Sequence, residues 1–243
     1  MCGRFVLDRT TAELSTLFDA DVVGAGLPEP SWNLAPTQRI SIVLDSLAKA
    51  TEDDPYPEPV RRIEAARWGL VPSFAKEPSS RPPLITARAE DAAETTSFAT
   101  AVAKRRAIVP ATGYYEWLAA GESRVPHYVS LPDGELMLFA AVYEWWRNPA
   151  AASDSPDRWL LSTSILTRSS AGSLTEIHDR MPVFIDADLV EGWLDPQEDG
   201  SQELVDQLVW GAGEVAERCR FHRVSASVGS VDNDGEQLIE AVG

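Results

Sequence analysis

The chain of 243 residues has little cysteine, lysine and histidine, and it contains no long apolar run. Its two cysteines, Cys2 and Cys219, are too few for a disulfide framework or a cysteine-ligated metal site. Without a run of about 18 apolar residues, no membrane span is expected. The chain does not open with a basic and then apolar export signal, so we expect a cytoplasmic protein.

Lysine is the scarcest charged residue. Three lysines and 18 arginines stand against 38 acidic residues, which gives a net charge of −17. A lysine-poor, strongly acidic composition suggests a salt-adapted cytoplasm in which ions screen the self-repulsion. Plain acidity for solubility is the alternative. Composition alone disfavours nucleic acid as a partner, because phosphates require positive charge, so a nucleic-acid site would need a local concentration of cations.

Short apolar segments between turn signals predict many strands and few long helices. Residues 10–20 have the spacing of an amphipathic helix that Thr10 or Thr11 caps. Residues 127–131 and 136–146 are expected to pair as a hairpin across Pro132-Asp133-Gly134. With no repeat and no linker, we interpret residues 1–243 as a single α+β domain with a polar C-terminal tail over 226–243. Its centre is predicted to be an antiparallel, partly barrelled sheet with peripheral short helices.

The first residues carry an unusual chemical group. The chain begins Met1-Cys2-Gly3, and removal of the initiator methionine would leave Cys2 with an α-amine beside its thiol. Reference pKa values of about 7.7–8.0 for the amine and about 8.5 for the thiol leave both partly reactive near neutral pH. The amine can act as base to the thiol in acyl transfer. Alternatively, it can condense with an aldehyde, and the thiol can then close a thiazolidine ring. Alone, a cysteine is more often structural than reactive.

Two residues are candidates for proton transfer. Glu116 lies in Gly-Tyr-Tyr-Glu-Trp, where aromatic neighbours favour partial desolvation of a carboxylate and thereby suit it to acid–base work. The alternative is a glutamate on the exposed face of a strand. His178 lies in Ile-His-Asp-Arg-Met-Pro, at the junction of a predicted short helix and a strand. Histidine is the usual proton shuttle near neutral pH, although a surface or capping histidine is also common at such junctions.

Arginines near turns are candidates for phosphate contacts. Arg4, Arg88 and Arg180 each lie beside a candidate segment, and Lys104-Arg105-Arg106 is the densest basic run. Arginine suits bidentate phosphate contacts. Ion pairing with the abundant acids is the alternative for all of these cations.

Three apolar residues could offer surfaces to bases. Trp68, Trp117 and Pro36 lie beside the candidate segments, and rings of these types can stack on or wedge between bases. Plain core packing is the alternative for each, and it is favoured for Trp68, the last residue of a strand predicted over residues 62–68.

Together these segments make the chain resemble the SRAP family, the SOS-response-associated peptidase-like proteins that crosslink to abasic sites in DNA. The resemblance extends from Cys2 to about Ser225. It rests on ordered motifs: Met-Cys-Gly-Arg-Phe at 1–5, Trp-Asn-Leu-Ala-Pro at 32–36, Arg-Trp-Gly-Leu-Val-Pro at 67–72, Ala-Arg-Ala-Glu at 87–90, Gly-Tyr-Tyr-Glu-Trp at 113–117 and Ile-His-Asp-Arg-Met-Pro at 177–182.

The resemblance implies a reaction and a site. Cys2 would attack the ring-opened aldehyde of an abasic site in single-stranded DNA and form a stable thiazolidine crosslink that protects the damaged strand. Glu116 would assist proton transfers, and His178 would help to open the sugar. The DNA contacts would come from Arg4, Asn33, Pro36, Arg88, Trp117, Thr167 and Arg180. No metal or organic cofactor is implied, and we expect a monomer associated with the nucleoid.

The chain also departs from the family pattern. Thr86 stands where the family usually has asparagine, and it offers one hydroxyl in place of an amide. Other functions stay open, since Met-Cys-Gly also begins glutamine amidotransferases. The chain could therefore be an N-terminal-nucleophile peptidase or amidohydrolase, with self-cleavage of Met1 as one form of that activity. A non-catalytic reader of modified DNA is a further alternative.

Overall fold

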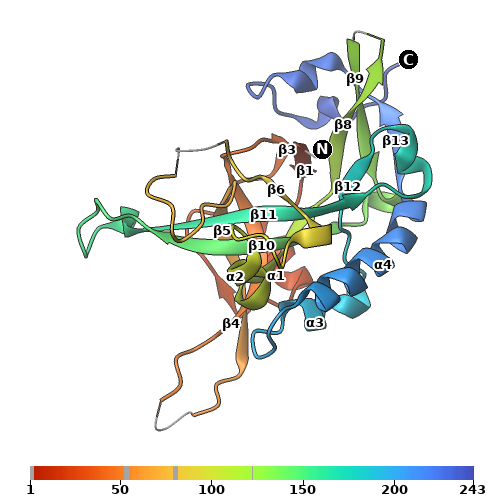
Figure 1. The fold of residues 1–243 in the computed structure, drawn as a ribbon. Helices are drawn as coiled ribbons and strands as arrows, with labels where there is room; N and C mark the ends of the chain where they lie inside the picture. Colours follow the sequence, from red (N-terminus) through yellow and green to blue (C-terminus); the bar gives the residue numbers. More distant parts are fainter. Residues whose placement is uncertain (1–2, 52–54, 79–81, 122) are drawn as a thin grey trace.

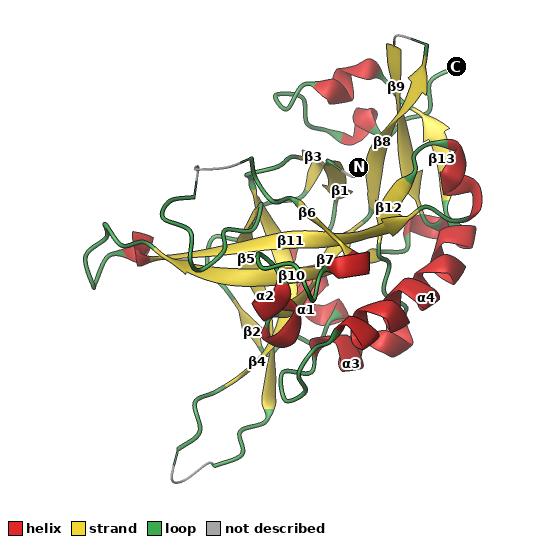
Figure 2. Cartoon of the chain, viewed as in Figure 1, coloured by secondary structure: helices red, strands yellow, loops and turns green. Residues whose placement is uncertain are grey.

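The computed structural model describes residues 3–51, 55–78, 82–121 and 123–243. Met1 and the predicted nucleophile, Cys2, therefore lie outside the described residues. Strands dominate the described chain (Figure 2). In chain order they are β1 (Arg4–Leu7), β2 (Val22–Val23), β3 (Ser31–Leu34), β4 (Arg39–Leu47), β5 (Pro59–Trp68), β6 (Thr86–Arg88), β7 (Arg106–Ala111), β8 (Gly113–Ala120), β9 (Ser123–Ser130), β10 (Met137–Arg147), β11 (Trp159–Ser169), β12 (Arg180–Pro182) and β13 (Arg220–Arg223).

The helices are short except for the one near the C-terminus. The α-helices are α1 (Thr11–Leu17), α2 (Ala99–Lys104), α3 (Val190–Leu194) and α4 (Gln202–Arg218). The 3-10 helices are η1 (Ala89–Asp91), η2 (Pro132–Gly134), η3 (Pro156–Arg158), η4 (Gly172–Glu176), η5 (Ala187–Leu189), η6 (Ala226–Gly229) and η7 (Glu236–Leu238). Helix α1 begins with the predicted cap, in which the Thr10 hydroxyl and the Glu13 carboxylate each accept the other residue's backbone N–H.

The strands form two sheets, one of which closes on itself. One sheet has the order β13-β9-β8-β1-β3. In the other, β5, β4, β7, β10 and β11 pair in turn, and β11 then pairs in parallel with β5 through Ser162 and Arg67. This last pairing closes a small barrel, and α3 and α4 lie together on one side of the molecule (Figure 1). The predicted α+β fold around a partly barrelled sheet is confirmed. No helix within the described ranges is long and apolar enough to cross a membrane.

Aromatic rings fill the main core where the two sheets meet. Phe5 of β1 packs edge-on against Trp68 of β5, with ring centroids 5.1 Å apart, and Phe139 contacts Phe5 and Tyr114. Trp68 is fully buried, which confirms the core role expected for it. Each ring of this size contributes on the order of 2–3 kcal/mol by leaving water. The core therefore fixes β1 and β8 against the barrel.

The hairpin predicted for residues 127–131 and 136–146 is wrong. Strand β9 pairs with β8 and β13, whereas β10 pairs with β7 and β11 in the other sheet. The Pro132-Asp133-Gly134 segment does turn the chain, with Asp133 and Gly134 at φ 56° and 71°. It turns the chain from one sheet into the other, because each strand finds its apolar partner face in a different sheet.

The C-terminal segment packs on the far face of the five-stranded sheet. Val228 and Leu238 are buried in a small second cluster with Val6, Tyr115 and Tyr128. A Cβ on Gly113 would lie 2.4 Å from the Tyr128 ring, so only glycine lets that ring cover the strand there. This cluster brings residues from both ends of the chain to the same sheet.

Candidate active site

Glu116 and His178 come together between the two sheets. Glu116 lies on β8 and its side chain is 6% exposed, while His178 lies in the turn before β12 and its side chain is 22% exposed. The imidazole Nε2 is 3.7 Å from the Glu116 Oε1. A small closing motion would bring this pair to hydrogen-bond distance, as catalytic pairs often require. The structure thus unites the two residues predicted to transfer protons.

Strand β8 sets the direction of the Glu116 side chain. Side chains alternate along a strand, so Glu116 shares the face of Tyr114, which packs into the main core. Tyr115 and Trp117 take the opposite face and pack with the second cluster. Across the sheet, His127 of β9 is the direct partner of Glu116, and its Nδ1 lies 3.0 Å from the Val125 carbonyl oxygen. Glu116 therefore lies between core aromatics and two histidines.

The ring of His178 has three partners at Nδ1, of which the Arg180 carbonyl oxygen, at 3.2 Å, is the most distant. The Arg180 backbone N–H donates to Nδ1 at 2.9 Å, and the Asp179 Oδ1 also lies 2.9 Å from that atom. The contact with the Arg180 N–H requires a ring without a proton on Nδ1, whereas the contacts with the two oxygens favour a ring that has one. The carbonyl contact is the longest of the three. The Arg180 amide is fixed by the backbone of β12, whereas the Asp179 side chain is 86% exposed and can turn into water. We therefore assign the proton of the neutral ring to Nε2, toward Glu116.

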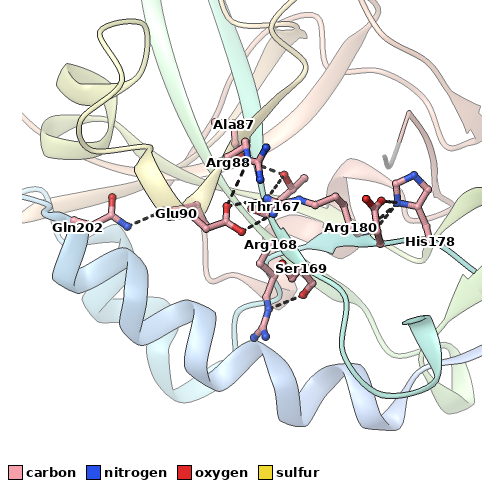
Figure 3. Close-up of polar contacts among 11 residues, drawn as sticks. Ala87, Arg88, Glu90, Thr167, Arg168, Ser169, His178, Arg180 and Gln202 are labelled. Carbon is pink, nitrogen blue, oxygen red and sulfur yellow. Dashed lines mark hydrogen bonds and ion pairs between the residues drawn. The ribbon is translucent and has the colours of Figure 1, made fainter. Parts of the chain in front are cut away.

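Arg180 is held by Glu90 and Thr167, as Figure 3 shows. Its two Nη atoms pair with the two carboxylate oxygens of Glu90, with Nη2 2.9 Å from Oε2. Nη2 also donates to the backbone oxygen of Thr167 at 2.6 Å. The hydrogen bond from Arg180 lowers the pKa of Glu90 below its ordinary value. This ion pair ties η1 to β12 and to the end of β11.

Other predicted site residues lie beside Arg180, where β6 and β12 both pair with the last residues of β11. We call this place the β11 edge. Strand β6 runs parallel to β11, with Thr86 opposite Ile165 and Arg88 opposite Thr167. Thr167 is buried and donates to the Ala87 carbonyl. The Arg88 side chain is 71% exposed, with its Nε 4.0 Å from the Glu90 carboxylate. Arg88 is thus the exposed cation of this edge, and Arg180 is the buried one.

Arg4 and Asn33 form a second group next to β8. Arg4 pairs across the sheet with Tyr115, the neighbour of Glu116, and donates to the Asn33 side-chain oxygen at 2.7 Å. It also donates to the Val228 carbonyl at 2.9 Å. The Asn33 amide donates to carbonyls of the same C-terminal segment, at Val228, Ser230 and Asn233. Partial burial lowers the pKa of the Arg4 guanidinium. Asn33, 2% exposed, is directed at protein atoms and holds Arg4 in place.

Trp117 and Pro36 lie at the edges of these groups. Trp117 is half-buried against the second cluster, and Pro36 is half-buried in the turn after β3. Both leave part of their ring surface accessible, which is compatible with the predicted contact with bases. Their role in DNA binding stays a prediction.

The densest basic run is used internally. Lys104 pairs with Asp199, and the Arg105 Nε lies 2.9 Å from the Glu144 carboxylate. Arg106 is 3% exposed. Its guanidinium donates to the backbone carbonyls of Val102, Ala103, Trp193 and Glu198. Ion pairing and burial thus account for this run. Arg4, Arg88 and Arg180 therefore remain the predicted cations of the site.

Neither a metal cluster nor a reactive thiol occurs among the described residues. No three His, Cys, Asp or Glu side chains in this part of the chain gather closely enough to hold a metal ion. Cys219 is buried at the end of α4, and burial raises the pKa of its thiol to about 12. A thiol with that pKa stays protonated and unreactive near neutral pH.

Family comparison decides the assignment of the chain. The model of one family, described as SOS response associated peptidase (SRAP), matches residues 1–231. The chain belongs to the SRAP family. Its SRAP relatives include "Abasic site processing protein YoqW" of Bacillus subtilis, 30% identical over 99% of this chain and 100% of that protein. "Abasic site processing protein YedK" of Escherichia coli is 27% identical over the full length of both. "Abasic site processing protein HMCES" of Xenopus tropicalis is 28% identical, over 88% of this chain and 67% of that protein.

A solved structure shares the fold of the chain. A crystal structure of a protein from Bacteroides thetaiotaomicron superposes with a TM-score of 0.77 at 19% identity, over 99% of this chain and 100% of that one. Several residues that contact the predicted site residues were not singled out from the sequence. Glu90 and Asp179 touch the predicted residues directly, and the carbonyls of residues 228–233 hold Arg4 and Asn33. Glu90 has a readable signal, because it follows Arg88 by two positions in Ala-Arg-Ala-Glu.

Proposed function

We propose that the protein processes abasic sites in single-stranded DNA through a covalent bond between Cys2 and the opened sugar. The observation that carries the proposal is the Glu116–His178 pair, 3.7 Å apart and mostly buried, on the strand that pairs with β1. Gly3 alone separates Cys2 in sequence from Arg4, the first residue of β1. The relatives named abasic site processing proteins support the same substrate.

The chemistry needs only an aminothiol and proton transfer. After Met1 is removed, the Cys2 amine adds to the aldehyde carbon, and loss of one water gives an imine. The thiol then adds to the imine carbon: a C–S bond forms, the thiol proton moves to nitrogen, and a thiazolidine ring closes. The net reaction releases one water and involves no oxidation or reduction. We assign the proton transfers to Glu116 and His178, whose carboxylate and Nε2 face one another.

The DNA strand would be held by a local group of arginines on an acidic protein. Arg88 is largely exposed, Arg4 is the cross-strand partner of Tyr115 next to Glu116, and the Arg180 backbone contacts His178. Because the net charge is −17, phosphate contacts would be confined to this group of arginines. DNA binding would then release few counterions, so the affinity should fall only moderately as the salt concentration rises. Pro36 and Trp117, which are half-buried, complete the proposed lining. The buried Asn33 and Thr167 would act by holding Arg4 and Arg180 in place. We propose that Thr86 substitutes for the usual amide by its hydroxyl.

A crosslinking gel tests the proposal. Purified protein is incubated with a single-stranded oligonucleotide that carries one abasic site, and the mixture is heated in denaturant. The expected result is a slow-migrating band that survives heating, with loss of the band in Cys2→Ala. Mass spectrometry should show that Met1 is absent and that the adduct is one water lighter than the sum of its parts.

Two outcomes would overturn this function. If wild-type protein gives no band, or if Cys2→Ala gives an equal band, the covalent reaction does not occur through Cys2. Full affinity for abasic DNA in Cys2→Ser together with no adduct in wild type would indicate a non-catalytic reader. Glutamine hydrolysis without an adduct would indicate an amidohydrolase with the same N-terminal nucleophile.

A further inference from the structure

A carboxylate lies between the two arginines of the β11 edge (Figure 3). The Glu90 carboxylate accepts hydrogen bonds from both Nη atoms of Arg180, and its Oε2 is 4.0 Å from the Arg88 Nε. This placement is unexpected on an edge proposed to bind phosphate, because a fixed negative charge repels the DNA backbone. A residue that weakens binding in this way needs another role.

Arg180 connects Glu90 to the proposed acid–base pair. The guanidinium is 11% exposed, and it is held by Glu90 on one side and by the oxygens of Thr167 on the other. The backbone N–H of the same residue donates to the His178 Nδ1 at 2.9 Å. A bidentate arginine–carboxylate pair fixes direction as well as distance. The side chain of Arg180 therefore anchors the peptide group that orients the His178 ring.

Helix α4 fixes the segment that carries Glu90, which is η1 and the residues after it. The Gln202 Nε2 donates to the Ala89 carbonyl at 2.7 Å, and the Gln202 Oε1 accepts from the Ala93 N–H at 3.3 Å. Figure 3 shows Gln202 extending from α4 toward this segment. A helix of 17 residues thus holds η1 in place, so the Glu90 carboxylate has a rigid support.

We infer that Glu90 is a positioning residue for the reaction: it holds Arg180, and the Arg180 peptide group keeps the His178 proton on Nε2, facing Glu116. The inference rests on the proposed function, because it assigns how that site is kept in order. Misplacing a catalytic group by about 1 Å can slow a reaction by about 100-fold, so losing this anchor is expected to slow crosslinking by about 10- to 100-fold.

The inference makes a prediction opposite to simple electrostatics. Glu90→Gln removes one negative charge beside the proposed DNA path, so charge alone predicts tighter binding and a reaction at least as fast. A positioning role predicts that the maximal crosslinking rate falls while the half-saturating DNA concentration stays the same or decreases. Asp91→Asn is the matched control, since it makes the same change one residue further on. Among the described residues, no ion pair to Asp91 is found.

The experiment measures crosslinking rates over a range of abasic oligonucleotide concentrations. The expected results are a maximal rate about 10- to 100-fold lower in Glu90→Gln and an unchanged rate in Asp91→Asn. Glu90→Asp keeps the charge and should recover part of the loss. Glu90→Gln combined with Arg180→Lys should be no slower than Arg180→Lys alone, since both changes break the same link.

A spectroscopic measurement reports on the ring itself. Nitrogen-15 shifts of the histidines distinguish the Nε2–H from the Nδ1–H tautomer, and His178→Asn identifies the signals of His178. We expect the Nε2–H form in the wild type, and a mixture or the Nδ1–H form in Glu90→Gln, with an unchanged thermal unfolding midpoint. A change in the midpoint with an unchanged tautomer would reduce Glu90 to a structural role and overturn the inference.

The two proposals fail in different ways. If wild-type protein does not crosslink, the proposed function falls, and the inference falls with it. If wild-type protein crosslinks and Glu90→Gln matches Asp91→Asn in rate, only the inference is overturned. A Glu90→Gln variant that loses affinity at an unchanged maximal rate would also overturn it, because that result assigns Glu90 to DNA binding.

Discussion

Two regions of this molecule use arginine in opposite ways. Beneath α3 and α4, Arg106 is enclosed by backbone carbonyls and lies with its guanidinium carbon 5.9 Å from the centre of the Trp193 ring. At the β11 edge, Arg180 is held by a side-chain carboxylate that is 46% exposed. Carbonyls in a folded backbone cannot leave, whereas an exposed carboxylate can be replaced by water or phosphate. The partner therefore makes Arg106 a permanent part of the core, whereas the hold on Arg180 depends on a single carboxylate, that of Glu90, and on Thr167.

The largest effect is expected on the free energy of unfolding when the contacts of Arg106 are removed. Arg106→Met would leave the carbonyls of Trp193, Val102 and Glu198 without the donor that Arg106 supplies. Each buried polar group left without a partner costs about 1–3 kcal/mol, so the free energy of unfolding should fall by about 3 kcal/mol or more. Lys104→Met removes a surface pair and should cost about 1 kcal/mol at most. Urea denaturation of both variants measures the difference. Equal losses would contradict the assignment.

A second effect should appear in rate and not in stability. Glu116→Gln keeps the shape of the side chain but cannot exchange a proton, so crosslinking should slow by about 100-fold or more. His178→Asn is expected to do the same. Band formation over time measures the rate, and the denaturation midpoint serves as control. An unchanged rate in both variants would mean that Cys2 reacts without help from this pair.

A smaller effect should depend on pH. Arg180 holds the pKa of Glu90 below its ordinary value of 4.5. The ionised carboxylate thus stabilises the folded state above pH 4.5, and this contribution is lost as the pH falls through the lowered pKa. Between about pH 5 and about pH 3, the wild type should therefore lose more stability than Glu90→Gln. Parallel curves from denaturation at each pH would contradict the ion pair in solution.

The smallest effect concerns the two cysteines. Because burial raises the pKa of the Cys219 thiol to about 12, a maleimide at about pH 8 should label one thiol in the folded protein and two in the unfolded protein. Mass spectrometry should place the first label on Cys2. Rapid labelling of Cys219 in the folded state would show that the region around α4 opens more readily than its packing indicates.

Local features of the fold could be read from the sequence, but long-range pairings could not. The Thr10–Glu13 cap was predictable, since both partners lie within one helical turn. The pairing of β9 was not, because the Pro132-Asp133-Gly134 turn is compatible with a hairpin and with a change of sheet. Only the burial of each strand decides between them.

The same contrast between local features and long-range contacts holds for the candidate site. Residue types and family motifs identified Glu116 and His178 as candidates, but their contact depends on how β8 and β12 are placed by the two sheets. Glu90 was visible in a motif and was not selected, because its partner Arg180 is distant in sequence. The chemistry of a residue can be read locally, whereas its partners follow from the closed barrel.

The docking of the last residues on the first strand has a consequence for synthesis. A ribosome makes Arg4 first, and the carbonyl of Val228 that holds it is made 224 residues later. Strand β1 thus acquires these neighbours only after residue 229 has emerged from the ribosome. A nascent chain that ends before Val228 would lack these contacts to Arg4, so the order of synthesis delays the final arrangement of the amino-terminal strand.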